Sequence, residues 1–212
     1  MPGVHRFVPT DRPVERIARC VVGLALFGVG IALIIDADLG AAPWDVFHTG
    51  VSDLTGIPVG TVIILTGAAL LVLWIPLREQ PGLGTVLNAV EIGLVVDLVL
   101  PIVPEPDQLA ARLVMMFGGV VVIGVGSALY IGAGLGPGPR DGLMTGIARR
   151  GISVRAARTG IEVFVLAAGV ALGGAIGLGT AVFALGIGPL VQLFLPSLTI
   201  TPRPELATEV SR

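Results

Sequence analysis

The sequence has no lysine, a single cysteine and few charged residues for its length. Of its 212 residues only 13% are charged, about half the share that is usual in soluble domains. So few charges cannot cover a water-exposed surface. The one cysteine, Cys20, cannot form an internal disulfide, so the redox compartment stays open. The lack of lysine excludes a G-x-x-x-x-G-K-[ST] phosphate loop, and with it a self-powered ATPase.

Other familiar sites are missing as well. The two histidines, His5 and His48, lie far apart in the sequence and have no cysteine near them, so no metal-ligand spacing occurs. The G-x-S-x-G pattern of serine hydrolases is absent. Two G-V-G triplets, 28–30 and 124–126, lie inside apolar stretches and are typical of helix packing rather than of dinucleotide binding. We therefore predict no catalytic site, cofactor, metal or nucleic-acid partner.

What the sequence does contain is an internal repeat in apolar residues. Residues 24–40 read LALFGVGIALIIDADLG and residues 120–136 read VVVIGVGSALYIGAGLG, with nine of seventeen positions identical at an offset of 96. Residues 82–101 return as 177–196, with eleven of twenty positions identical at an offset of 95. Duplicated halves of this kind are typical of secondary transporters.

Six stretches are long and apolar enough to cross a bilayer, which takes about 20 residues. They are 17–36, 59–77, 84–103, 113–133, 159–176 and 179–198. The third and the fifth carry carboxylates, so these two must face protein or water rather than lipid. The sequence therefore predicts an all-α membrane protein with lipid as its first partner.

The arginines predict how the spans are oriented. If all six spans cross, twelve of the 13 basic residues fall on one side and only Arg112 falls on the other. This bias predicts that both polar tails, 1–16 and 199–212, are cytoplasmic. Each repeat, 17–103 and 113–198, holds three spans and so reverses the direction of the chain. The two halves are therefore expected to form a 3+3 inverted repeat.

Each half carries the same break after its first span. The shared pattern is L-G-x-x-P-x-D-x-x-x-T-G, in which glycine ends one helix and proline opens the next. Its signature residues are Gly40, Pro43 and Asp45 in the first half and Gly136, Pro139 and Asp141 in the second. The pattern predicts short helices over 43–54 and 139–150.

The aspartate of this motif lies in the first turn of each short helix, and two interpretations of it stay open. In one, Asp45 and Asp141 only cap the helix and offset its positive end. In the other, both short helices re-enter the membrane and point their N-termini at a central cavity that binds a solute or ion.

These motifs resemble a known family. The pairing of LGAAPWDV with LGPGPRDGL, the following TGIARRGISV, and the GLGT that opens the third and the sixth span are similar to the YczE/YitT-type family of bacterial integral membrane proteins. The resemblance covers 17–198. It implies a multi-span bacterial inner-membrane protein, and it supplies no substrate, reaction or catalytic residue.

Polar groups at membrane depth are the remaining candidates for the solute or ion pathway. Glu91 lies near the centre of its span without a basic residue in that span, and Asn88 lies one turn before it. Glu91 is either a cation- or proton-binding group or a protonated packing group that bonds Asn88. Asp97 either joins the pathway or reaches the outer surface, and Gln192 is its counterpart in the second half.

Glu162 follows Arg158 by four residues, which predicts an ion pair on one helix face. Arg149 and Arg150 belong to the same basic segment, which either reflects topology and lipid headgroups or binds a partner.

Two functional hypotheses follow. The first is a small secondary transporter or permease for an unidentified small solute or ion, with alternating access around the broken segments and Glu91 as the coupling group. The second is an accessory membrane protein that binds a partner complex through its basic cytoplasmic face. Six spans are few for a monomeric carrier, so a homodimer is also expected by analogy.

Overall fold

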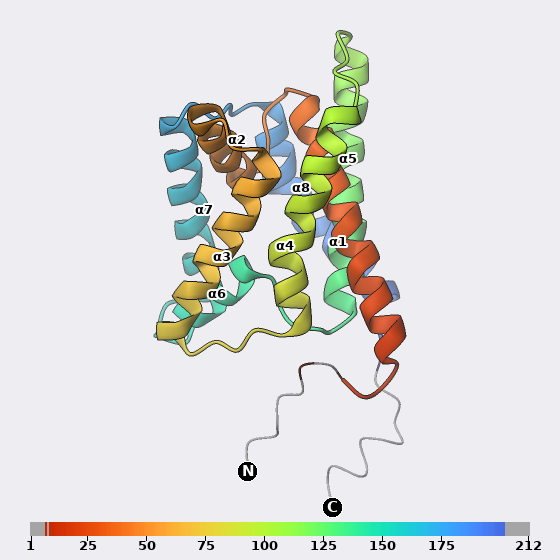
Figure 1. The fold of residues 1–212 in the computed structure, drawn as a ribbon, viewed down its shortest axis with the longest axis vertical. Coiled ribbons are helices and arrows are strands. Elements are labelled where there is room, and N and C mark those ends of the chain that lie inside the picture. Colours follow the sequence, from red (N-terminus) through yellow and green to blue (C-terminus); the bar gives the residue numbers. More distant parts are fainter. Residues whose placement is uncertain (1–6, 8, 202–212) are drawn as a thin grey trace, which may run out of the picture.

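The computed structural model describes Phe7 and residues 9–201, and all regular structure in this part of the chain is helical (Figure 1). The elements are α1 (Pro13–Asp36), α2 (Pro43–Thr55), α3 (Val59–Leu77), α4 (Leu83–Val99), the short 3-10 helix η1 (Leu100–Ile102), α5 (Leu109–Gly132), α6 (Pro139–Ala148), α7 (Val154–Ala171) and α8 (Leu178–Leu198). The predicted tails fall largely outside the described residues, and 13–16 already belong to α1.

Five helices are long and apolar enough to cross a membrane: α1, α3, α4 with η1, α5 and α8. The predicted fifth span, 159–176, is wrong in its bounds, because α7 runs from Val154 to Ala171. Ser153 starts this helix early by accepting a hydrogen bond from the backbone N–H of Ala156. The helix therefore includes Arg155, Arg158 and Glu162 and falls short of the other five in apolar character.

The two short helices form where the proline–aspartate motif predicts them. Helix α2 matches the predicted 43–54 to within one residue, whereas α6 stops two residues before the predicted end at 150. Both start with proline at the first helical position. In Figure 1 α2 lies at the upper end of the molecule and α6 at the lower end.

The centre of the fold is a glycine-lined crossing of α1 and α5, the most extensively packed pair. A Cβ on Gly23 would lie 2.6 Å from the carbonyl oxygen of Gly126, and one on Gly30 would lie 2.7 Å from that of Gly119. Residue numbers rise along one helix as they fall along the other, so the helices are antiparallel. The contacts are also reciprocal, because Gly119 and Gly126 are the repeat equivalents of Gly23 and Gly30 at the offset of 96.

Each short helix packs against the third helix of the other half. Helix α6 lies on α3, where the indole of Trp74 covers Gly142 and donates a hydrogen bond to the carbonyl oxygen of Pro139 (3.0 Å). Helix α2 lies on α7, where Gly169 leaves room for the backbone of Phe47. A glycine thus faces the Trp74 side chain in one interface and the backbone of α2 in the other.

A pair of arginines closes the two ends of the α1–α5 crossing. Arg16 at the start of α1 donates to the carbonyl oxygen of Ala133 at the end of α5 (2.7 Å), and Arg112 at the start of α5 donates to that of Ala37 at the end of α1 (2.7 Å). Both arginines satisfy C-terminal helix carbonyls, which otherwise lack a partner. Arg112, the exception to the arginine bias, is therefore the equivalent of Arg16 at the offset of 96.

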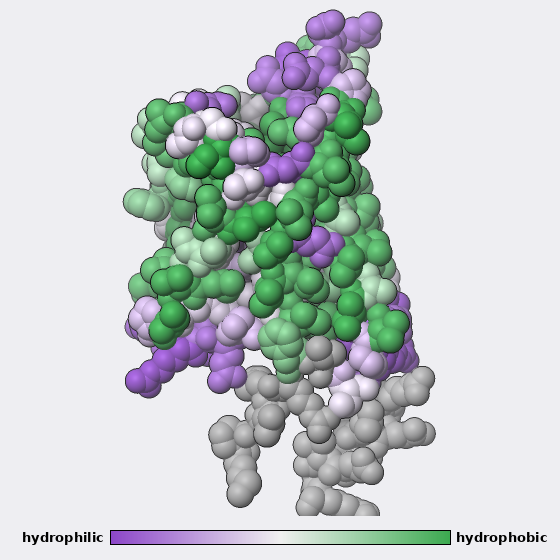
Figure 2. Space-filling view, in the orientation of Figure 1, coloured by the Kyte–Doolittle hydropathy of each residue, from purple (hydrophilic) through white to green (hydrophobic). Residues whose placement is uncertain are grey.

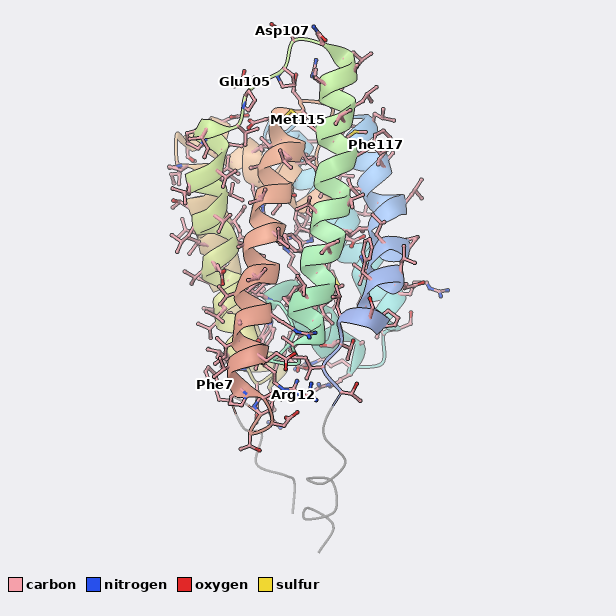
Figure 3. All side chains as sticks on the ribbon, turned by 90° about the vertical axis from the view of Figure 1, so that its right-hand side faces the viewer. Phe7, Arg12, Glu105, Asp107, Met115 and Phe117 are labelled. Atoms are coloured by element: carbon pink, nitrogen blue, oxygen red, sulfur yellow. The ribbon has the colours of Figure 1, made fainter. Side chains whose placement is uncertain are left out.

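Polar groups gather at the two ends of the molecule. Figure 3 has Phe7 and Arg12 at one end and Glu105 and Asp107 at the other. Figure 2 shows an apolar band between a polar top and a polar bottom on the face in view. This distribution is the one that a bilayer-spanning body requires.

Candidate ligand-binding cavity

The N-termini of the two short helices meet in one cavity. Pro43 and Trp44 at the start of α2 and Pro139 and Arg140 at the start of α6 line the same space of about 330 Å³. The guanidinium carbon of Arg140 lies 4.7 Å from the ring centroid of Trp44, within cation–π range. The two short helices lie at opposite ends of the molecule (Figure 1), and their N-termini converge at this point.

The glycines of the motif hold the short helices in place and do not line the cavity. Gly40 and Gly136 have positive φ (89° and 113°), which favours glycine. The residue before each of them accepts a backbone hydrogen bond from the G-L-G-T segment of the other half. Gly179 N–H donates to Leu39 O (2.7 Å) and Gly84 N–H to Leu135 O (2.8 Å).

These crossings are tight enough to require glycine on both sides. A Cβ on Gly177 or Gly179 would run into the backbone of 39–40, and one on Gly82 into that of Leu135. The two repeated motifs that the sequence presents, L-G and G-L-G-T, therefore dock on each other across the halves.

The two motif aspartates are placed differently from each other. Asp45 is buried, and its Oδ1 lies 3.3 Å from Nδ1 of His48. Asp141 lines the cavity and accepts a hydrogen bond from the hydroxyl of Tyr130 (3.1 Å). Their partners are thus side chains that also line the cavity.

His48 is fully buried and only half satisfied. Its Nδ1 faces Asp45, whereas no hydrogen-bond partner of its Nε2 is present among the described residues. If Nδ1 carries the proton that it shares with a charged Asp45, Nε2 is an unused acceptor. Sequence reasoning did not select His48, because a histidine near a Trp at a membrane boundary is ordinarily an interfacial residue.

Arg140 is the most informative residue that the predicted site omitted. It is half-buried and lines the cavity, and it makes no hydrogen bond or ion pair with any residue that the structure describes. A signal was present in the sequence, since Arg140 and Trp44 occupy equivalent positions of the repeat with unlike chemistry.

Of the other predicted pathway residues, Asn88, Glu162 and Gln192 line the cavity. The predicted ion pair is confirmed, with Arg158 Nε 2.9 Å from Glu162 Oε1. Arg158 also lines the cavity, although its side chain is 55% exposed. This pair therefore marks a side where the cavity is open.

Glu91 and Asp97 lie away from the cavity-lining residues. The carboxylate of Asp97 accepts hydrogen bonds from the backbone N–H of Gly60 (2.6 Å) and the hydroxyl of Thr61 (2.9 Å), so it caps the start of α3. Glu91 is half-buried on α4, and no hydrogen bond joins it to Asn88 in the described structure.

We place the opening of the cavity between α7 and α8, which both line it and are not among the extensively packed helix pairs. The equivalent pair, α3 and α4, is closely packed through Gly60 and Gly93. Gly188 is the equivalent of Gly93 at the offset of 95, and no atom of the described residues lies within 4 Å of a Cβ added there. Phe164 on α7 and Leu185 on α8 are exposed, so the outer surfaces of these two helices would face hydrocarbon in a bilayer.

Filling this gap is expected to block access to the cavity. The change Gly188→Trp adds an indole at a position where, among the described residues, no atom lies within 4 Å of an added Cβ. We expect N-ethylmaleimide to label a cysteine at cavity residue Ser127 at least about tenfold more slowly, a barrier increase of about 1.4 kcal/mol. The control is Gly118→Trp on α5, another glycine with open space beside it. Equal labelling rates in the two variants would contradict an opening at this place.

The basic segment after α6 is partly used within the fold. Arg149 Nη2 lies 3.2 Å from Glu79 Oε2, and Arg150 donates to the carbonyl oxygen of Pro76 (2.6 Å). Both arginines therefore hold the end of α6 against the end of α3.

Together these features define a multi-pass helical membrane protein with a polar centre. The chain belongs to DUF6198, a family of unknown function, whose model matches residues 14–196. The resemblance to the YczE-type proteins is confirmed: the chain is 38% identical over 178 residues to the uncharacterized membrane protein YczE of Bacillus subtilis, covering 82% of each chain.

Two further relatives are similar over most of their length. An uncharacterized protein of Haemophilus influenzae is 37% identical over 189 residues, covering 89% of this chain and 87% of the relative. The uncharacterized protein YyaS of Bacillus subtilis is 30% identical over 182 residues, covering 82% and 90%. No solved structure matches the chain.

Proposed function

We propose that the protein is a small secondary transporter or permease of the bacterial plasma membrane, built from six spans as a 3+3 inverted repeat. The observation that carries the proposal is the cavity at which the N-termini of α2 and α6 converge. Broken segments that meet at a central site are the recurrent plan of inverted-repeat transporters. Alternating access then exposes this one cavity to each side of the membrane in turn.

The reciprocal contacts support the inverted arrangement. Three kinds of contact occur twice, once in each direction between the halves. They are the close glycine contacts of α1 with α5, the arginine–carbonyl hydrogen bonds and the backbone hydrogen bonds between L-G and G-L-G-T. Such self-complementary pairing is what a two-fold relation between two similar units produces. Helix α7 serves as the sixth span in this proposal, because it packs against α2 and α6, which lie at opposite ends of the molecule (Figure 1).

The charged groups of α7 suit this role. Glu162 and Arg158 pair with each other and line the open side of the cavity. Ionisable groups within a span are tolerated when they are paired or reach water. The arginine bias supports an orientation with both termini in the cytoplasm, since Arg112 is bound to Asp38 and to Ala37 O.

Two-sided accessibility of one cavity residue tests the proposal without knowledge of the substrate. The reporter is Ser127→Cys, a near-isosteric change at a buried cavity-lining position, with the buried native thiol removed by Cys20→Ala. A membrane-impermeant maleimide is applied to right-side-out and to inside-out vesicles. We expect labelling in both, because the cavity opens to each side in turn.

Two exposed positions provide the controls. A cysteine at Glu105 is expected to react only in right-side-out vesicles, and one at Ile152 only in inside-out vesicles. If the thiol at 127 reacts from one side only, alternating access is contradicted. A static accessory protein would then be the better description.

A further inference from the structure

We propose that the cavity binds a small monocarboxylate with an apolar body, and that Arg140 holds its two carboxylate oxygens. The inference names the substrate class of the same cavity and so rests on the proposed function. It is tested by equilibrium binding, so that its failure and the failure of transport give different results.

The first step is the unused hydrogen-bonding capacity of Arg140. A guanidinium carries five N–H donors in a planar fork. In the described part of the chain none of these donors is paired, although the residue is half-buried in the cavity. The guanidinium carbon lies over the Trp44 ring, 4.7 Å from its centroid. A cation–π contact of this kind uses none of the N–H donors, so they remain able to bind both oxygens of a carboxylate.

The nearby carboxylates do not accept hydrogen bonds from Arg140. Asp45 lies against His48 and Asp141 accepts from Tyr130, and neither forms an ion pair with Arg140. They do act on Arg140 through space. The arginine is therefore compensated in charge but unsatisfied in hydrogen bonds.

The third step is the charge of the site. Arg140 contributes one positive charge and the two aspartates contribute two negative charges, whereas the charges of Arg158 and Glu162, which pair with each other, cancel. The N-termini of α2 and α6 add roughly half a positive charge each. The sum is close to zero, so the site accommodates a single negative charge on the ligand more readily than a phosphate or dicarboxylate with two.

The fourth step is the apolar remainder of the lining. Phe27, Ile63, Leu70, Ile92, Phe183 and Ile187 surround the polar centre. A volume of about 330 Å³ corresponds to roughly ten water molecules at about 30 Å³ each. It is therefore large enough for a ligand at least as large as benzoate, whose ring would contact the apolar walls. The gap between α7 and α8 offers such a ligand access from the hydrocarbon.

Calorimetric titration of the full-length protein in detergent at neutral pH tests the inference. The probes are benzoate, its neutral analogue benzamide, and nitrate as a small inorganic anion. We expect benzoate to bind at least about tenfold more tightly than either, because the bonds to a charged acceptor are the stronger ones. In Arg140→Gln this preference is expected to disappear. In Arg140→Lys it is expected to weaken, because an ammonium keeps the charge but lacks the fork.

The matched control is Arg155→Gln, which removes an exposed arginine of α7 that does not line the cavity. It is expected to bind benzoate as the unaltered protein does. Should Arg140→Gln fail to fold, the Lys variant and the benzoate-to-benzamide ratio of the unaltered protein still decide the matter.

The inference is overturned if benzoate does not bind, if benzamide or nitrate binds equally well, or if Arg140→Gln keeps the benzoate affinity. Selective benzoate binding together with one-sided labelling at residue 127 would retain the site and reject transport. Two-sided labelling without a carboxylate preference would retain transport and reject this ligand class.

Discussion

Gly93→Ala is expected to destabilise the protein severely, whereas Gly188→Ala, the same change at the equivalent position of the second half, is expected to be harmless. A Cβ on Gly93 would collide with the carbonyl oxygen of Gly60 and would lie 2.6 Å from a side-chain carbon of Ile64. The carbonyl belongs to the backbone of α3, so no rotamer change relieves the contact. Helices α3 and α4 must then move apart.

The separation has a second cost, because Asp97 on α4 caps the start of α3 through Gly60 and Thr61. Overpacking costs about 1–3 kcal/mol and occasionally more, and a lost cap adds about 1 kcal/mol. We therefore expect a loss of about 2–4 kcal/mol, seen as a large fall in the melting temperature of the detergent-purified protein or as loss of folded material.

The control rests on the open space beside Gly188. No atom lies within 4 Å of an added Cβ there, and alanine favours a helix over glycine by up to about 1 kcal/mol. The melting temperature of Gly188→Ala should equal or slightly exceed that of the unaltered protein. Equal losses in the two variants would mean that α7 and α8 pack as closely as α3 and α4, and that the cavity has no opening between them.

This asymmetry explains how far the repeat could predict the fold. The repeat predicted the broken helices and their proline starts, because glycine and proline act locally on the backbone. It could not predict that α7 and α8 diverge. That difference arises from what faces the glycines: the positions that correspond to Gly60 and Gly67 hold Arg155 and Glu162 in the second half. A glycine that is identical in both halves does not predict close packing when the residues on the facing helix differ.

The site was predictable in part for a related reason. Pro43, Pro139 and Asp141 were selected from the motif and line the cavity. The sequence reveals that Arg140 differs from its equivalent Trp44. It does not reveal that the two side chains touch, because this contact depends on how the halves cross. Glu91 was selected for its depth and for the lack of a basic residue in its span, and neither feature says whether a side chain faces the cavity or a neighbouring helix.

Arg16→Met is expected to cause the second large loss of stability, and Arg12→Met, at the residue just before the same helix, is expected to cause little. Arg16 is only 4% exposed. It donates to Ala133 O (2.7 Å), to the backbone oxygen of Asp11 (2.9 Å) and to the Asp11 carboxylate (2.6 Å). Methionine keeps the apolar part of the side chain and removes all three bonds. The buried Ala133 carbonyl then loses its charged partner, which costs about 2–4 kcal/mol.

The ion pair of Arg12 with Glu15 is weak because both side chains are exposed to solvent. Arg12 lies 3.6 Å from Glu15 and both side chains are well exposed, so its loss should cost about 0–1 kcal/mol. The measurement is the free energy of unfolding, or the melting temperature, of both variants in one detergent. Similar small losses would mean that Arg16 does not hold the end of α5.

The pH dependence separates the bond of Arg16 to the Asp11 carboxylate from its two bonds to backbone oxygens. The hydrogen bond from Arg16 holds the pKa of the Asp11 carboxyl below its usual value of 3.8. A carboxyl whose pKa is lowered in the folded state stabilises the protein above its unfolded pKa, and this contribution is lost as the pH falls through the folded pKa. Between neutral pH and about pH 4 the difference between the unaltered protein and Arg16→Met should therefore stay constant, and it should narrow below that. Because the bond to the Ala133 carbonyl does not titrate, Asp11→Asn should remove the acid-sensitive part alone and leave most of the stabilisation in place.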